Sequence, residues 1–346
     1  MKPGLLSSPA KQPGPGAAAL PGERDIIAGI RARVPAPPPW LRVGIGDDAA
    51  VVQPERGALE ILTTDALVEG IHFDRRFSAP RDIGWKALAV NLSDIAAMGG
   101  TPRLALLSLA LPAELGADDL HALVDGFLEL AGEARVALAG GNITRSPGPL
   151  VVDVTVTGFA RPRHVLTRAG GGVGDDLYVT GEVGAAAAGL AWLRAGAQPE
   201  DAALAACARR HRRPEPRVRV GALLGRNRAA TACMDLSDGL ADAVRQVSEA
   251  SGTGAAIDAS AVPIPAAARS WFDRAGEDPI VSAVAGGDDY ELLFTVPKRA
   301  RGRLATVIRQ ARGVPMTRIG TLTRDGTVAL IRNGRPEPLP QGFVHF

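Results

Sequence analysis

Aspartates recur along this chain in short motifs that could bind metal ions. The motifs span residues 44–49 (GIGDDA), 63–65 (TTD), 91–94 (NLSD), 235–239 (DLSDG) and 286–291 (GGDDYE). Since the chain has only 5 histidines and 2 cysteines, oxygen ligands dominate, and these favour magnesium over zinc. Magnesium held by sparse carboxylates usually also binds substrate phosphates. The motifs therefore indicate metal-assisted phosphate chemistry.

Asp94 is the strongest single candidate for a metal ligand. It lies in the apolar segment WKALAVNLSDIAAM, where an unpaired buried carboxylate would be costly. Asn91, three residues earlier, would share a helical face with it. A solvated polar stripe is the alternative, but the flanking residues are nearly all apolar. We therefore favour a ligand role.

Turns and strand ends offer structural explanations for other aspartates. Asp47 and Asp48 could form a turn, because Gly-Asp and Asp-Asp pairs favour turns. We expect only a turn at the comparable Gly174-Asp175-Asp176 sequence, and Asp65 could simply end a strand.

Asp235 and Asp238 do not fit a calcium-binding loop, because the required order of acidic residues, with glycine and a final glutamate, is missing. Ser237 or Asp238 could cap the helix that follows. A cap accounts for only one of the two aspartates.

The common nucleotide-binding signatures are absent from the sequence. It contains no Gly-x-x-x-x-Gly-Lys-Ser/Thr loop, no protein-kinase glycine-rich loop and no catalytic His-Arg-Asp run. By themselves, the residues indicate metal-assisted phosphoryl or nucleotide chemistry outside the common folds.

Alternating strand and helix patterns predict an α/β (α+β) fold. In the first half, we expect strands at 50–53, 59–63, 104–111 and 150–158, and helices from an N-cap at Asp82 to Gly99-Gly100 and over 117–137. In the second half, we expect strands at 176–180, 255–257, 290–296 and 318–322, and helices at 184–195, 215–224, 240–251 and 298–311. The stretch 209–217 is interpreted as a loop.

The domain organisation follows from composition. Residues 1–22 are rich in Pro, Gly and Ala and predict a disordered extension, followed by domains at 23–163 and 164–346.

A net charge of +2 and 4% aromatic residues argue against nucleic-acid binding. The two cysteines suit a reducing compartment, and neither a membrane span nor a signal peptide is expected. We expect a cytoplasmic protein.

Six motifs together resemble those of thiamine-monophosphate kinases, in the superfamily of aminoimidazole ribonucleotide synthetase and selenophosphate synthetase. They are, in order, GIGDDAAVV, TTDALVEGIHFD, KALAVNLSDIAAMGG, GGNITRSP, MDLSDGL and GGDDYELLF, and the resemblance covers residues 23–346. It implies a two-domain aminoimidazole ribonucleotide synthetase-like fold whose N-terminal domain dimerises through its sheet. It also implies ATP, several Mg²⁺ ions and thiamine monophosphate as the acceptor.

The resemblance further implies roles for single residues. Metal ligands would be Asp48, Thr63, Thr64, Asp65, Asp94, Asn142, Asp235 and Asp238. ATP would contact Arg168, Ser237 and Gly141, and thiamine monophosphate would contact His72, Asp288 and Phe343. No general acid or base is expected.

Two positions depart from some relatives, which carry Asp in place of Asn142 or Glu in place of Asp288. An amide can still coordinate through its carbonyl oxygen but offsets less positive charge. The implied acceptor is a phosphate monoester with a second pKa of about 6, so it is largely dianionic at neutral pH and needs no base. Magnesium would relieve the repulsion between the phosphates and align an in-line attack.

Two alternatives stay open. One is another ATP-using member of the superfamily. Selenophosphate synthetase would need a reactive cysteine near the N-terminus, whereas none precedes Cys207. Aminoimidazole ribonucleotide synthetase acts on a ribonucleotide, which the His72 motif disfavours. The other alternative is a nucleotide-binding regulator without catalysis, which Asn142 favours and the retained aspartates disfavour.

Overall fold

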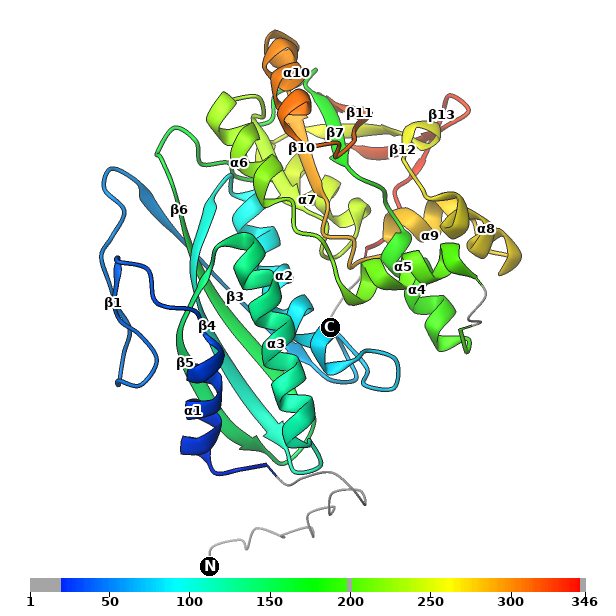
Figure 1. Ribbon diagram of the computed structural model, residues 1–346. Coiled ribbons are helices and arrows are strands. Elements are labelled where there is room, and N and C mark those ends of the chain that lie inside the picture. Colours follow the sequence, from blue (N-terminus) through cyan, green and yellow to red (C-terminus); the bar gives the residue numbers. More distant parts are fainter. Residues whose placement is uncertain (1–19, 198–200, 343–346) are drawn as a thin grey trace, which may run out of the picture. The chain divides into compact units, whose positions relative to one another are not determined.

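The computed structural model describes residues 20–197 and 201–342, which form two compact units (Figure 1). The predicted N-terminal extension therefore lies almost entirely outside the described residues. Unit 1 comprises Met1–Pro54, Thr64–Ala87 and Leu104–Thr155, and unit 2 comprises Glu55–Thr63, Leu88–Arg103 and Val156–Phe346. Several elements contribute residues to both units, so the predicted division at residues 163 and 164 stays a prediction.

A four-stranded sheet contains the four longer strands of the first half, in the order β3-β6-β4-β5. Its strands are β3 (Leu59–Val68), β4 (Thr101–Pro112), β5 (Ala137–Ser146) and β6 (Val151–Ala160). β4 and β5 pair in parallel, which requires a crossover connection, and helix α3 (Ala117–Ala134) provides it. Helix α1 (Glu23–Arg33) and the short pair β1 (Leu41–Val43) and β2 (Val51–Val52) complete the N-terminal elements.

Helix α2 (Pro80–Ala97) packs against its neighbours through glycines that allow close backbone approach. In unit 1, a Cβ at Gly84 would lie 1.8 Å from Leu123 O of α3, and a Cβ at Gly126 would lie 1.8 Å from Arg81 O. In unit 2, a Cβ at Gly221 of α6 (Val218–Asn227) would lie 1.9 Å from Ala96 O. Only glycine can occupy these three positions without separating the helices.

Unit 2 is built on a seven-stranded sheet in the order β13-β12-β9-β11-β7-β10-β8. Its strands are β7 (Asp176–Thr180), β8 (Ala232–Asp235), β9 (Gly254–Asp258), β10 (Leu292–Val296), β11 (Met316–Thr323), β12 (Val328–Arg332) and β13 (Arg335–Pro338). The other described helices of unit 2 are α4 (Ala185–Arg194), α5 (Ala202–Arg212), α7 (Leu240–Ser251), α8 (Ala266–Arg274), α9 (Pro279–Ala285), α10 (Arg301–Gln310) and the 3₁₀ turns η1 (Ala259–Ala261) and η2 (Lys298–Ala300). Fully buried residues of the central strands and of α7, such as Leu177, Val244 and Leu293, form its main core.

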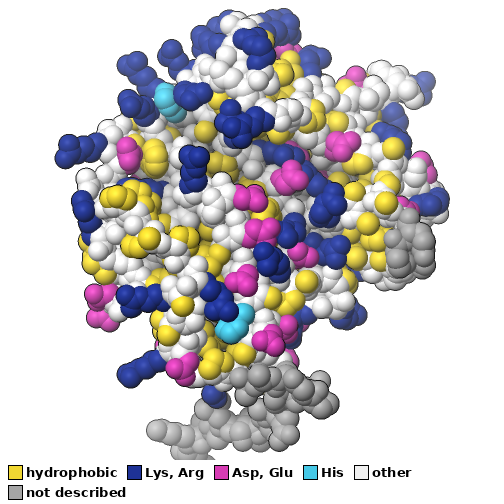
Figure 2. Space-filling view, viewed as in Figure 1, with side chains coloured by type: hydrophobic (Ala, Val, Ile, Leu, Met, Phe, Trp, Pro, Cys, Tyr) yellow, Lys and Arg dark blue, Asp and Glu magenta, His cyan; other side chains and the backbone are white. Residues whose placement is uncertain are grey.

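Basic side chains gather over η2 and α10, which lie at the top of the view in Figure 2. Residues 298–312 carry six Lys and Arg and no Asp or Glu. These basic residues are interrupted by uncharged ones, so the sequence shows no continuous block of like charge here. Arg301 is partly neutralised, because it pairs with the buried Asp176.

The α/β layering is confirmed, and several boundaries need correction. The strand at 176–180 and the helix at 240–251 match β7 and α7. The stretch 209–217 is not all loop, because α5 continues to Arg212. Helix α2 begins at Pro80, so Asp82 lies in its first turn and is not the N-cap. Among the described helices and strands, α1, α5, α8, α9, β1, β5, β8, β12 and β13 were not predicted.

Candidate active site

In unit 2, two of the predicted metal-ligand aspartates, Asp94 and Asp235, each accept a hydrogen bond from a hydroxyl group. Thr63 of β3 donates a hydrogen bond from its hydroxyl to Asp94 Oδ2 of α2. Ser93, the residue before, donates to Asp235 Oδ2 at 2.8 Å, and Asp235 ends β8 with 3% exposure. Hydroxyl donors orient a carboxylate while leaving it further lone pairs. A hydroxyl group therefore orients each of these two carboxylates.

The DLSDG loop lies directly against the GGDDYE segment. The backbone amides of Asp288 and Tyr290 donate to Ser237 O and Leu236 O at 2.8 and 3.0 Å. A Cβ at Gly239, where φ is +96°, would lie 2.7 Å from Gly286 O. The motifs that begin at residues 235 and 286 are therefore joined through backbone contacts.

The expected cap of helix α7 is corrected by the structure. Its N-cap is Gly239, with no side-chain capping hydrogen bond, so neither Ser237 nor Asp238 caps it. A capping role therefore does not explain the presence of Ser237 or Asp238. Both side chains come just before the helix, where backbone amides and the helix dipole favour anions.

Asp288, a predicted substrate contact, has two aromatic partners. Tyr290 donates from its hydroxyl to Asp288 Oδ1 at 3.2 Å, and His211 Nδ1 lies 3.0 Å from Asp288 Oδ2. His211 is 3% exposed and belongs to the last turn of α5. Sequence reasoning missed it, and the signal that could have indicated it is the dense Arg-His stretch RRHRR.

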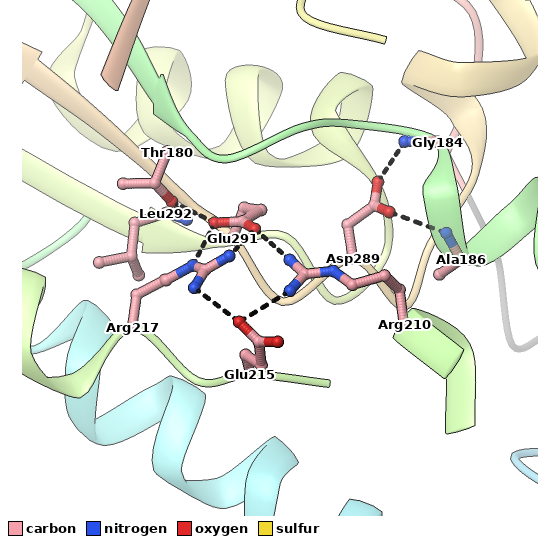
Figure 3. Close-up of polar contacts among 9 residues, drawn as sticks. All are labelled: Thr180, Gly184, Ala186, Arg210, Glu215, Arg217, Asp289, Glu291 and Leu292. Carbon is pink, nitrogen blue, oxygen red and sulfur yellow. Dashed lines mark hydrogen bonds and ion pairs between the residues drawn. The ribbon is translucent and has the colours of Figure 1, made fainter. Parts of the chain in front are cut away.

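Two buried carboxylates of the same segment, Asp289 and Glu291, bind other parts of unit 2 (Figure 3). Asp289 accepts hydrogen bonds from the amides of Gly184 and Ala186, at 2.6 and 3.2 Å. Burial raises the pKa of Asp289 to about 7, even though these amides favour the ionised form.

Glu291 is fully buried and lies between two guanidinium groups. Arg217 binds both of its oxygens, Arg210 binds Oε1, and Thr180 donates to Oε2 at 2.6 Å. Glu215 contacts Arg210 and Arg217 from the outside at 3.1 and 3.2 Å. The charges within this cluster balance, which a buried ionic group requires.

In unit 1, the loop that carries His72 is fixed at two points. The amide of Val68 donates to His72 Nδ1 at 3.1 Å. Lys86 of α2, only 2% exposed, donates from Nζ to His72 O at 3.0 Å. Because Nδ1 accepts a hydrogen bond, a neutral His72 ring carries its proton on Nε2. Nε2 can then donate to a ligand.

The remaining predicted residues of unit 1 occupy strands and a turn. The Thr64 hydroxyl lies 3.2 Å from Asp153 Oδ1 and from Thr155 Oγ1, and half-buried Asp65 follows it on β3. Asp48 is exposed, and its amide donates to Asp47 Oδ1 as in a turn.

Gly141 and Asn142 lie on β5, where Asn142 is in register with Ser108 of β4. A Cβ at Gly141 would lie 1.8 Å from Leu107 O, so glycine is required there by packing alone.

The predicted residues thus fall into two sets. Unit 2 brings together Thr63 with Asp94 and the Asp235–Asp238 loop with Asp288, and it contains Arg168, whose guanidinium donates to Gln246 Oε1. Unit 1 contains Asp48, Thr64, Asp65, His72, Gly141 and Asn142. Phe343 lies outside the described residues.

Within the described ranges, no three His, Cys, Asp or Glu side chains form a group that could hold a metal ion. The donor chemistry nevertheless suits magnesium, since carboxylate, hydroxyl and amide oxygens make up the predicted set. The roles of these residues stay predictions.

Gly174-Asp175-Asp176 proves to be more than a turn. Asp175 accepts hydrogen bonds from Gly172 N and Thr231 Oγ1 at 3.0 and 2.8 Å. Asp176 begins β7 and is paired with Arg301 and Arg318. Burial would raise the pKa of Asp176, but hydrogen bonds from the two arginines lower it below its usual value. Both carboxylates therefore stabilise the fold.

Comparison with known families defines the class of the chain. The AIR synthase related protein N-terminal domain matches residues 46–160, and the AIR synthase related protein C-terminal domain matches residues 172–333. These two matches together cover most of the chain, in the order expected for the two-domain fold.

Curated relatives then identify the family. A thiamine-monophosphate kinase of Escherichia coli K12 is 40% identical over 329 residues, covering 94% of this chain and 98% of the relative. The one from Rhodopirellula baltica is 36% identical over 335 residues, covering 93% and 97%. The chain belongs to the thiamine-monophosphate kinase family, which confirms the resemblance.

Solved structures confirm the fold class. The thiamine-monophosphate kinase of Stenotrophomonas maltophilia K279a has a TM-score of 0.79 and 36% identity, covering 90% of this chain and 96% of that one. The structure of AaThiL complexed with AMPPCP and TMP has a TM-score of 0.75 and 31% identity, covering 93% and 95%.

Proposed function

We propose that this protein transfers a phosphoryl group from ATP to thiamine monophosphate and so produces thiamine diphosphate. The observation that carries the proposal is near full-length similarity to thiamine-monophosphate kinases, including a structural relative that binds AMPPCP and TMP. The site residues described above come from the motifs shared with that family. Localisation to the cytoplasm and pairing into a homodimer are further parts of the proposal.

Magnesium ions are proposed to bind the oxygen ligands predicted from the motifs: Asp48, Thr63, Thr64, Asp65, Asp94, Asn142, Asp235 and Asp238. When bound, magnesium neutralises phosphate charge and polarises the transferred group. The hydroxyl groups of Thr63 and Ser93 would keep the Asp94 and Asp235 carboxylates oriented while these bind. Orientation by such supporting contacts usually raises metal affinity.

The chain's own residues have separate tasks toward the two substrates. Arg168, Ser237 and Gly141 are proposed to contact ATP. His72 is proposed to donate from Nε2 to the phosphate of thiamine monophosphate, since Val68 already occupies Nδ1. Asp288 and Phe343 would contact the thiamine half.

No general base is needed in this scheme, because the dianionic phosphate is already a nucleophile at neutral pH. Catalysis then depends on positioning and on charge neutralisation around the in-line transfer. The residues proposed here suit that task, since they are hydrogen-bond donors and oxygen ligands.

The proposal is tested by incubating the purified protein with thiamine monophosphate and ATP, with and without Mg²⁺, and separating the products by chromatography. We expect thiamine diphosphate only in the presence of Mg²⁺. ATP binding without any thiamine diphosphate would contradict the proposal and favour a regulator or another acceptor. None of the helices in the described parts of the chain is long and apolar enough to cross a membrane.

A further inference from the structure

The segment 286–291 follows a strained backbone path beside the Asp235–Gly239 loop. Asp288 and Tyr290 have φ values of +70° and +49°, in the left-handed region that side chains other than glycine rarely adopt. Strain of this kind persists only where the surrounding contacts hold it, and it is common at binding sites. The contacts that hold this segment are therefore relevant to function.

Two anchors fix the segment from inside unit 2. Asp289, 4% exposed, is bound by the amides at the start of α4. Glu291 is bound by Arg210, Arg217 and Thr180 (Figure 3). A Cβ at Gly181 would lie 2.1 Å from the Glu291 carboxylate, so the backbone around Glu291 is closely packed. These anchors fix where the Asp288 backbone lies.

Different groups contact the Asp288 side chain: the His211 ring lies at ion-pair distance, and Tyr290 donates a hydrogen bond. His211 Nδ1 lies 3.0 Å from Oδ2, and the Tyr290 hydroxyl lies 3.2 Å from Oδ1. His211 follows Arg210 directly on α5, so one helix end reaches both the Glu291 anchor and the Asp288 carboxylate. With 3% exposure, the His211 ring has little freedom to move away.

We propose that His211 is a positioning residue for thiamine monophosphate, because it holds the Asp288 carboxylate in place for the thiamine half of the substrate. The inference rests on the proposed function, in which Asp288 contacts that substrate. Thiamine has a permanently cationic thiazolium ring and an aminopyrimidine, and a fixed carboxylate is complementary to both. Fixing the carboxylate in advance reduces the entropy lost on binding.

The test compares His211→Leu, which removes the ring nitrogen, with His211→Asn, whose amide can place a donor near the position of Nδ1. In steady-state assays, we expect His211→Leu to raise the KM for thiamine monophosphate about tenfold and to leave the KM for ATP within about twofold. His211→Asn should recover most of the affinity. Arg209→Leu, an exposed change on the same helix, is the control.

A double-mutant cycle isolates the contact. In an Asp288→Ala background, His211→Leu should change the KM for thiamine monophosphate little further, because its partner is already gone. Independent fold changes for the two substitutions would overturn the proposal, as would equal KM increases for both substrates in His211→Leu.

Equilibrium binding of thiamine monophosphate, measured by calorimetry without ATP, provides a readout that does not depend on activity. We expect His211→Leu to raise the Kd for thiamine monophosphate about tenfold, while hydrogen–deuterium exchange in the peptide 286–291 stays at the wild-type rate, because Asp289 and Glu291 hold its backbone. A wild-type Kd in this variant would overturn the proposal. If the wild-type protein makes no thiamine diphosphate, the proposed function is wrong, and that failure is seen before any variant is compared.

Discussion

Buried polar side chains orient the predicted binding groups in both units, and Lys86 shows this at the level of one residue. Its ammonium group, on a 2% exposed residue, donates to His72 O at 3.0 Å. Lys86→Met keeps the length of the side chain and removes the donor. We expect the KM for thiamine monophosphate to rise about tenfold, equivalent to roughly 1.4 kcal/mol, with the KM for ATP unchanged. Lys298→Met, at an exposed position, is the control.

Asp94 allows a test of the metal shell. Asp94→Ala removes a carboxylate that Thr63 holds in place, and we expect kcat to fall by roughly a thousandfold or more. The melting temperature should stay close to that of the wild type, because a charge is removed from an apolar helix. Asp258→Asn alters an exposed aspartate at η1 and should leave kcat unchanged. Near-normal turnover of Asp94→Ala would rule out Asp94 as a ligand.

Asp289 makes stability depend on pH. Its pKa is raised to about 7 in the folded protein, chiefly by burial, against about 3.9 in the unfolded chain. The folded state therefore binds this proton more tightly. Its contribution to stability is complete below the unfolded pKa and is lost as pH rises through 7, by up to about 1.4 kcal/mol per pH unit.

Urea unfolding of wild type and Asp289→Asn at pH 5, 6 and 7 measures this effect. The difference in unfolding free energy, wild type minus variant, should fall as the pH rises, because all other titrating groups are common to both proteins. A difference that does not vary with pH would contradict the raised pKa.

At the level of elements, glycine determines how closely helices α2 and α3 pack. A Cβ at Gly126 would lie 1.8 Å from Arg81 O, so Gly126→Ala must push the helices apart. We expect a loss of roughly 1–3 kcal/mol or more in the unfolding free energy. Gly132 is on the same helix with no atom within 4 Å of its Cβ position, so Gly132→Ala should instead stabilise by about 0.5–1 kcal/mol. Thermal or urea unfolding of both variants checks this contrast.

Local sequence patterns predicted some elements and missed others for physical reasons. β7 and α7 were predicted because their apolar residues repeat with a clear period. β5 was missed because its sequence, ALAGGNITRS, is glycine-rich and polar, and its pairing with β4 joins residues more than thirty apart. β8 has only 4 residues, too few to show a period.

The candidate site shows the same limit. Its aspartates were found from the motifs alone, and the structure places two of those motifs in direct contact. The groups that support them were not found, since Arg210, His211 and Arg217 lie in a stretch interpreted as a loop. Arg217 and Arg210 contact Glu291 from 74 and 81 positions away in the sequence. A local sequence pattern cannot indicate contacts between residues so far apart in the sequence.

On the scale of the whole molecule, β3 is an edge strand of the four-stranded sheet. Natural edge strands are usually protected by charges, prolines or bulges. β3 carries the exposed Glu60, but on either side of it Leu59 and Leu62 are also exposed, at 50% and 69%. Exposed leucines on an unpaired edge indicate an interaction site, in line with the predicted pairing of two copies through this sheet.

Sedimentation of the wild type and of Leu62→Lys tests that pairing. We expect the wild type to sediment as a dimer and Leu62→Lys to shift toward the monomer, because a charge on an apolar contact must be desolvated when the copies associate. Ile308→Lys places the same charge on α10, at a residue with 44% exposure, and should leave the dimer intact. A monomeric wild type would refute the predicted pairing. Dissociation by both substitutions would show that added charge alone weakens association, so that the contact lies elsewhere than β3.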